Sequence, residues 1–200
     1  MARTPQKIQC VQYVLLGLLF QQPGHGYELH KRISSKSGIG LLWSVKQGNL
    51  YAMLDRMERR GLVRSSVRPG ESNPSRKEFF LTLTGRVAFE AWISTPVRAW
   101  NELPQDFLSK YYFARQCGPA VLSSLIQQQL EVTRGWLKQV EDELAGMDAS
   151  QAFEKDVLCL RREQIGASLR WLESLVSQAR LAGAEKVIPV SLLVPSEPNQ

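Results

Sequence analysis

Apolar side chains recur every three or four residues along the first part of the chain and predict a run of short helices. One helix is expected over residues 8–20 and a shorter one over residues 26–35. A third is predicted to begin at Ser44, because Ser44 and Gln47 have the spacing of a capping box. It is expected to end at Gly61, a residue type that commonly terminates helices.

After residue 61, the pattern of apolar and polar residues becomes typical of β-strands. Residues 62–68 and 77–82 have the Val, Leu and Phe content of strands with partial alternation, and the segment between them is rich in Pro, Gly, Ser and Asn. Thr82 or Thr84 is expected to cap a further helix that runs to Ile93. Three helices followed by a β-hairpin describe a winged helix-turn-helix.

The second half of the chain is predicted to be helical throughout. A short helix over residues 107–115 precedes two long ones over residues 119–146 and 152–182. An antiparallel pair of this length leaves part of its apolar stripes uncovered, so we expect the chain to form a homodimer through this region.

The fold is therefore expected to be mainly α. An N-terminal winged helix-turn-helix with a small β-hairpin wing occupies residues 1–95, and a C-terminal antiparallel helical dimerisation region occupies residues 96–183. Residues 184–200 contain three prolines and are expected to form an extended tail, which either docks or stays mobile.

Charge is divided unevenly between these regions. The chain of 200 residues carries 25 Lys and Arg against 19 Asp and Glu, a net charge of +6. Residues 1–95 hold 14 of the basic and 6 of the acidic side chains, whereas residues 96–200 hold 11 and 13. A cationic first half suggests a polyanionic partner such as nucleic acid, although a soluble basic surface gives the same count.

Composition excludes several other classes of protein. Three cysteines without CxxC spacing and two histidines five residues apart predict neither a disulfide framework nor a metal site, and favour a cytoplasmic location. The longest apolar run, residues 13–20, is too short to span a membrane. Phosphate-binding loops, GxSxG and HExxH motifs are absent, so we expect neither an enzyme nor a cofactor.

The predicted third helix carries the residue types that bind base edges. Lys46, Gln47 and Asn49 lie near its N-terminus, the part of a helix that enters the major groove, and Arg56 lies further along the same polar face. Amide side chains can bond adenine, and lysine can donate to guanine. The alternatives are that Gln47 only caps the helix and that Asn49 is an ordinary surface residue.

Further cations lie on the predicted wing and are expected to contact phosphates or the minor groove. They are Arg64, Arg68, Arg76 and Lys77. A solvated basic hairpin is the alternative for all four. Tyr27, at the start of the second helix, either donates to a phosphate or is buried against the first helix.

Several motifs resemble a known family. Gly-Tyr-Glu-Leu at residues 26–29, the run from Gly48 to Val63, and Phe-Leu-Thr at residues 80–82 are similar to the PadR family of bacterial transcriptional regulators. The resemblance implies a homodimeric repressor with a winged helix and a variable helical region, often responsive to small aromatic compounds. It also implies that Tyr51 contacts backbone phosphate. The segment before the second wing strand departs from the family pattern, as does Phe80, where Tyr is common.

Aromatic residues gather around the predicted joint between the two regions. Trp92, Trp100, Phe107 and Tyr111 can stack on a small aromatic effector, or they can simply belong to the core. The sequence thus predicts a homodimeric DNA-binding regulator, expected to be a repressor acting at an inverted-repeat operator and released by such an effector. The competing hypothesis is a winged helix that binds another protein without direct DNA readout.

Overall fold

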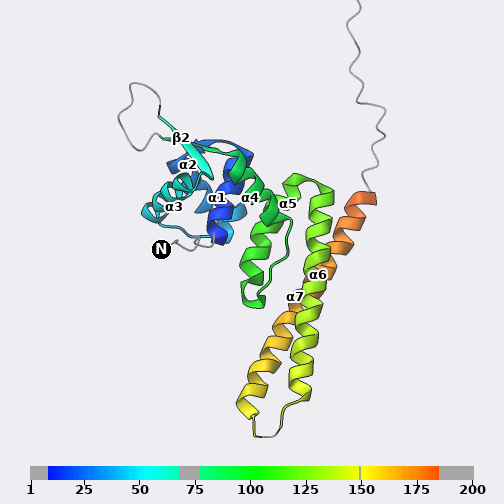
Figure 1. Cartoon of the computed structure of the whole chain (residues 1–200). Helices are drawn as coiled ribbons and strands as arrows, with labels where there is room; N and C mark the ends of the chain where they lie inside the picture. The colour runs from blue at the N-terminus through cyan, green and yellow to red at the C-terminus, as the bar shows by residue number, and fades with distance from the viewer. Residues whose placement is uncertain (1–8, 68–76, 149, 185–200) are drawn as a thin grey trace, which may run out of the picture. The chain divides into compact units, whose positions relative to one another are not determined.

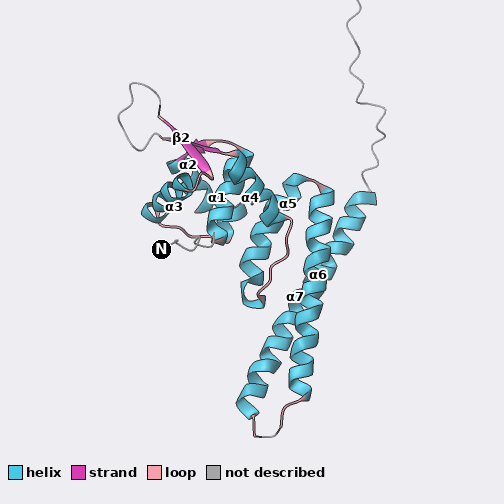
Figure 2. Cartoon of the chain, in the orientation of Figure 1, coloured by secondary structure: helices cyan, strands magenta, loops and turns pink. Residues whose placement is uncertain are grey.

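The structure, a computed structural model, describes residues 9–67, 77–148 and 150–184. It is mainly helical, with one small sheet near the N-terminal end of the chain (Figure 1, Figure 2). The chain divides into two compact units at Val132, within its sixth α-helix. Within the described ranges, no helix is long and apolar enough to cross a membrane.

Three helices at the start of the first unit enclose its core. They are α1 (Cys10–Gln21), α2 (Gly26–Ile33) and α3 (Gln47–Arg59). Residues 14–16 of α1 are completely buried, as are Leu29 of α2 and Leu54 of α3. The helices predicted from the apolar spacing are therefore confirmed.

A three-stranded antiparallel sheet completes this core. The wing strands β2 (Val63–Ser66) and β3 (Glu78–Leu81) pair as predicted, with Val63 opposite Leu81. A short strand β1 (Gly24–His25), which the sequence analysis missed, pairs with the other edge of β3 and gives the order β1-β3-β2. The wing therefore pairs with the connection between α1 and α2 as well as with itself.

Thr82 begins the next helix, α4 (Leu83–Ile93), as one of the two predicted caps. Its hydroxyl accepts a hydrogen bond from the Gly85 amide at 3.0 Å and lies 2.6 Å from the Gly61 carbonyl, to which it can donate. Because Gly61 and Leu62 lead into β2, one side chain fixes both the start of α4 and the start of the wing.

Two buried polar side chains hold the segment after α4. The ammonium group of Lys110, in α5 (Leu108–Cys117), donates to the carbonyls of Trp92 (2.8 Å) and Thr95 (2.6 Å). The amide of Gln129, in α6 (Pro119–Ala145), accepts from the Val97 amide (2.7 Å) and donates to the Val97 carbonyl (3.2 Å). Between α4 and α5 the chain forms the short turns η3 (Trp100–Glu102) and η4 (Leu103–Phe107). The hydrogen bonds of Lys110 and Gln129 hold the segment that follows α4 in place within the first unit.

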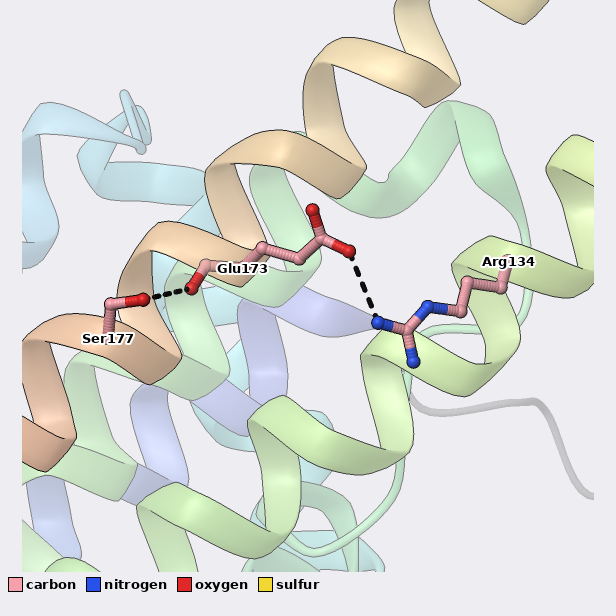
Figure 3. A network of polar contacts seen from close by, with 3 residues as sticks. All are labelled: Arg134, Glu173 and Ser177. Atoms are coloured by element: carbon pink, nitrogen blue, oxygen red, sulfur yellow. Dashed lines mark hydrogen bonds and ion pairs between the residues drawn. The ribbon is translucent and has the colours of Figure 1, made fainter.

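The second unit is an antiparallel pair made by the end of α6 and by α7 (Ala152–Ala184) (Figure 1). Val140 on α6 and Leu158 and Ile165 on α7 are buried. Arg134 of α6 forms an ion pair with Glu173 of α7 at 3.1 Å (Figure 3). Two long helices were predicted here, and both are present.

Candidate nucleic-acid interface

The start of α3 differs from the prediction. The helix begins at Gln47 with Lys46 as its N-terminal cap residue, and no side chain provides a capping hydrogen bond, so the capping box expected at Ser44 is wrong. The physical reason lies in the carbonyl of Val45. It accepts hydrogen bonds from His30 Nε2 (2.8 Å) and from the Ser34 hydroxyl (3.4 Å), which hold this segment against α2 instead of in the first turn of α3.

Helix α3 has one buried face and one exposed face. Leu50, Met53, Leu54 and Met57 are buried, as expected. Three predicted DNA-contact residues at the start of the helix, Lys46, Gln47 and Asn49, are all exposed. A Cβ atom built on Gly48 would meet nothing within 4 Å, so this turn is open to an approaching molecule.

The electrostatics of this end of α3 favour an anion. The first backbone amides of a helix have no carbonyl partner within the helix, and the helix dipole places partial positive charge there. The first turn contains no acidic residue that would offset this charge, and Lys46 adds a full positive charge beside it. The arrangement suits a strongly anionic surface that also presents hydrogen-bonding groups, as a DNA groove does.

The ring of Tyr51, on α3, packs against the start of α2, which also carries Tyr27. A Cβ atom built on Gly26 would lie 2.5 Å from the Tyr51 ring and 3.0 Å from its hydroxyl oxygen, so the ring rests directly on the Gly26 backbone. Gly26 is needed here because any side chain would displace the ring. Tyr27 is 59% exposed, which excludes its burial against α1.

Further cationic side chains lie towards the C-terminal end of α3 and on the wing. Arg56 is exposed and donates through Nε to the Ala52 carbonyl at 3.1 Å. On β2, the exposed Arg64 stacks over the ring of its cross-strand neighbour Phe80, 4.4 Å from the ring centre. Lys77 is half-buried just before β3, while Arg68 and Arg76 lie outside the described residues.

A hydrogen bond fixes the wing relative to α3. The Ser65 amide on β2 donates to Glu58 Oε1 on α3 at 2.8 Å. This contact could not be predicted from the sequence, because Glu58 belongs to the charged run that ends the helix. This bond joins α3 directly to the base of the wing.

The four proposed effector residues differ in burial and in the elements that carry them. Trp92 is in the core, where its ring stacks on Tyr13 with 5.1 Å between centres. Phe107 is buried and stacks with the half-buried Tyr111 at 6.1 Å, and Trp100 is half-buried in η3. Core packing therefore accounts for Trp92, the alternative that the sequence left open.

An aromatic cavity of about 350 Å³ lies elsewhere in the first unit. Its walls come from α1, α4 and α5, and none of the four proposed residues lines it. The lining residues are Phe20, Gln21, Phe89, Phe113, Gln116 and Cys117. They are distant in sequence, and no local pattern joins them, which explains why they were missed.

Metal and acid–base chemistry receive no support from the geometry. The described part of the chain contains no group of three His, Cys, Asp or Glu side chains able to hold a metal ion. Burial raises the pKa of the Cys10 thiol and lowers the pKa of Lys110 to about 8. Both groups lie inside the first unit, where Lys110 binds backbone carbonyls.

Comparison with known proteins identifies the family of this interface. Residues 15–91, which run from α1 into α4, match the model of the transcriptional regulator PadR-like family. The negative transcriptional regulator PadR of Bacillus subtilis (strain 168) is 22% identical over 179 residues, covering 85% of this chain and 97% of that protein. This is a family of transcriptional regulators and not of enzymes.

Two solved structures of the Bacillus protein are also similar to the chain. PadR in complex with operator DNA gives a TM-score of 0.43 at 21% identity, covering 86% of this chain and 99% of the other. PadR in complex with p-coumaric acid gives 0.40 at the same identity and coverage. Residues 15–91, which contain the winged helix, therefore match the PadR-like family of transcriptional regulators, and the chain as a whole is similar to a PadR protein of nearly equal length.

Proposed function

We propose that this protein binds duplex DNA in a sequence-dependent manner by placing the start of α3 in the major groove. The observation that carries the proposal is the exposed, acid-free first turn of α3, with Lys46, Gln47 and Asn49 on its surface. A major groove about 12 Å wide admits one helix, and side chains near the helix N-terminus then reach base edges.

The surrounding residues are suited to the phosphate backbone. Tyr27 lies at the start of α2, where the ring of Tyr51 from α3 rests on Gly26, and Arg56 and Arg64 extend the cationic surface to the wing. Contacts of this kind orient a protein on the duplex without selecting a sequence. We assign Arg68, Arg76 and Lys77 the same role, which completes residues 1–95 as the DNA-binding domain.

We further propose that the chain acts as a homodimer through residues 96–183. On α7, Phe153, Val157 and Leu160 are 75%, 40% and 61% exposed, and their spacing places them on one face of the helix. Burying such a stripe against a second copy removes apolar surface from water. A symmetric dimer would place two α3 helices about one DNA turn apart, 34 to 36 Å, on an inverted repeat.

Repression and effector response are proposed by relation to the Bacillus protein. Its name describes a negative regulator, and it has been crystallised with p-coumaric acid. We propose that this chain is likewise a repressor whose DNA binding responds to a small aromatic effector, and that it acts in the cytoplasm. The aromatic cavity beside Phe20 and Phe113 suits such a ligand better than the four residues proposed from sequence, because one of these, Trp92, is in the core.

The experiment is a DNA selection from random sequence followed by binding measurements on the selected duplex. We expect Lys46→Ala with Asn49→Ala to abolish discrimination between that duplex and a scrambled one. The control Lys155→Ala, which removes an exposed charge from α7, should keep it. Selective binding by the double variant at wild-type strength would contradict the proposal.

Salt distinguishes this function from the protein-binding alternative. Binding to DNA releases counterions, so the affinity should fall steeply between about 50 and 200 mM salt. A winged helix that only binds protein would enrich no DNA sequence and would show no such dependence on a duplex.

A further inference from the structure

A second cavity of the first unit, about 330 Å³ in volume, has a different character from the aromatic one. It lies where α1, the end of α2, the turn before η1 (Gly38–Leu41) and α5 meet. Its lining combines two cations, three hydroxyl groups and two aliphatic side chains. The residues are Leu18, Lys31, Arg32, Ser35, Ser37, Gly38, Ile39 and Tyr112.

Neither cation forms a close ion pair with a described residue, although the charge of Glu28 acts on Arg32 from further away. Among the residues that the structure describes, no carboxylate lies within 4.0 Å of Lys31 or Arg32, although ion pairs of this kind form elsewhere in the chain. Burial also lowers the pKa of Arg32, so its positive charge is partly desolvated where it stands. A partly desolvated cation without a carboxylate in direct contact is stabilised by an anion that binds next to it.

Arg32 is nevertheless held in place. One terminal nitrogen donates to the Leu18 carbonyl at 3.2 Å and the other to the side-chain carbonyl of Gln21, both on α1. A guanidinium group has five N–H donors, and these two bonds leave the others to a ligand. The side chain is therefore oriented before a ligand arrives, which reduces the entropy lost on binding.

The other side of the cavity is formed by the turn at Gly38 and by Tyr112, which approach each other closely. Gly38 has a φ of +57°, a conformation that favours glycine, and a Cβ atom there would lie 3.4 to 3.8 Å from the Tyr112 ring. The Ser35 hydroxyl donates to the Ser37 carbonyl at 2.6 Å and closes the turn. The rim of the cavity is thus an ordered turn on one side and the Tyr112 ring on the other.

We propose that this cavity binds a small organic anion. Its carboxylate or phosphate group is held by Lys31 and Arg32, with the hydroxyl of Tyr112 as a further donor. A compact apolar body contacts Leu18 and Ile39. The site shares no lining residue with the aromatic cavity, so the two can be tested separately.

The position of the site suggests what the ligand does. It bridges α5 to the turn that joins α2 to α3, and Val45 just before α3 is already hydrogen-bonded to His30 and Ser34 of this region. An anion across the cavity would restrain that turn and with it the start of α3. This consequence for DNA binding rests on the function proposed above, whereas ligand binding itself does not.

The test is isothermal titration calorimetry on the full chain without DNA. The probes are cyclohexanecarboxylate, cyclohexyl phosphate and the neutral cyclohexanecarboxamide, which share one apolar ring and differ in the charge of the headgroup. We expect saturable binding of at least one anion and none of the amide. Tighter binding of the carboxylate or of the phosphate ester identifies the headgroup.

Substitutions of lining residues test whether the anion binds in this cavity. Lys31→Gln and Tyr112→Phe should each weaken the preferred anion, the first by about tenfold, the value of one charge-assisted hydrogen bond. Lys36→Gln is the matched control, because Lys36 is exposed on the same turn but does not line the cavity. Equal binding of the amide, no binding of either anion, or equal loss in the control would overturn the proposal. A failure of DNA selection with anion binding intact would instead refute only the proposed function.

Discussion

The helices α3 and α7 both bury one face and expose the other, but only α7 also exposes a stripe of large apolar side chains. On α3 the exposed residues include Lys46, Gln47 and Asn49, which can form hydrogen bonds and carry charge. On α7 they include Phe153 and Leu160, which can do neither. A polar, cationic surface suits the wet and charged groove of DNA, whereas an apolar stripe is stabilised by contact with protein. The chemistry of the exposed face, more than the fold, distinguishes the proposed roles of the two helices.

Two phenylalanines provide the strongest test of this difference. Phe89 is completely buried among Phe20, Trp92 and Phe113, so Phe89→Ala should lower the free energy of unfolding by about 3 to 5 kcal/mol. Phe153 is 75% exposed, so Phe153→Ala should change monomer stability little and weaken self-association instead. Urea unfolding and sedimentation equilibrium measure the two effects. A large loss of monomer stability in Phe153→Ala would show that the α7 stripe belongs to the monomer's own core.

Lys110 should make stability depend on pH. Its pKa is lowered by burial to about 8 in the folded chain, below the value of about 10.5 expected when unfolded. Unfolding then takes up a proton between these values, so the contribution of Lys110 to stability rises as pH increases from about 8 to 10.5. The unfolding free energy of the parent chain, minus that of Lys110→Met, should therefore rise by a few kcal/mol over this range.

The measurement for Lys110 is best made in a Cys10→Ala background. Burial raises the pKa of the neighbouring Cys10 thiol, whose titration has the opposite effect on stability. A difference between the two chains that is constant with pH would show that the Lys110 ammonium is not desolvated.

A smaller effect is expected at the junction of α4 and the wing. Thr82→Ala removes the cap of α4 and the contact with the Gly61 carbonyl, and should cost about 1 to 2 kcal/mol. Thr82→Ser retains the hydroxyl and should recover most of this loss. Equal destabilisation by both substitutions would assign the effect to the methyl group instead of the hydrogen bonds.

The smallest effect is expected in the second unit. Arg134 and Glu173 form an ion pair with side chains that are 57% and 48% exposed (Figure 3). Solvent screens such pairs, so Arg134→Ala should cost below about 1 kcal/mol, and less at high salt. Thermal unfolding at two salt concentrations tests this, and a loss comparable to that of Phe89→Ala would contradict it.

The sequence predicted the features that depend on neighbouring residues. The buried face of α3, the pairing of the wing strands and the cap at Thr82 all follow from spacing within a few positions. Features that join distant residues were missed. The capping box at Ser44 was wrong because His30 binds the Val45 carbonyl, and the contact of Tyr51 with Gly26 had no local signal.

The candidate site shows the same division. Exposure of Lys46, Gln47 and Asn49 could be anticipated from the helical period, since Leu50 and Met53 fix which face is buried. Neither cavity could be anticipated, because each is assembled from several elements. Trp92 is an example. Its aromatic ring suggested a ligand site, whereas the structure places it among the packed residues of the core.

The most direct test of DNA binding through α3 is photocross-linking from Ala52. This residue is exposed on the same face as Asn49 but is not itself a proposed contact. With a photoreactive amino acid at position 52 and the selected duplex present, we predict a cross-link to DNA that unlabelled duplex competes away. The same group at position 153 should cross-link to a second copy of the chain. Cross-links from position 52 to protein alone, under conditions in which the duplex is bound, would contradict the assignment of α3 to the major groove.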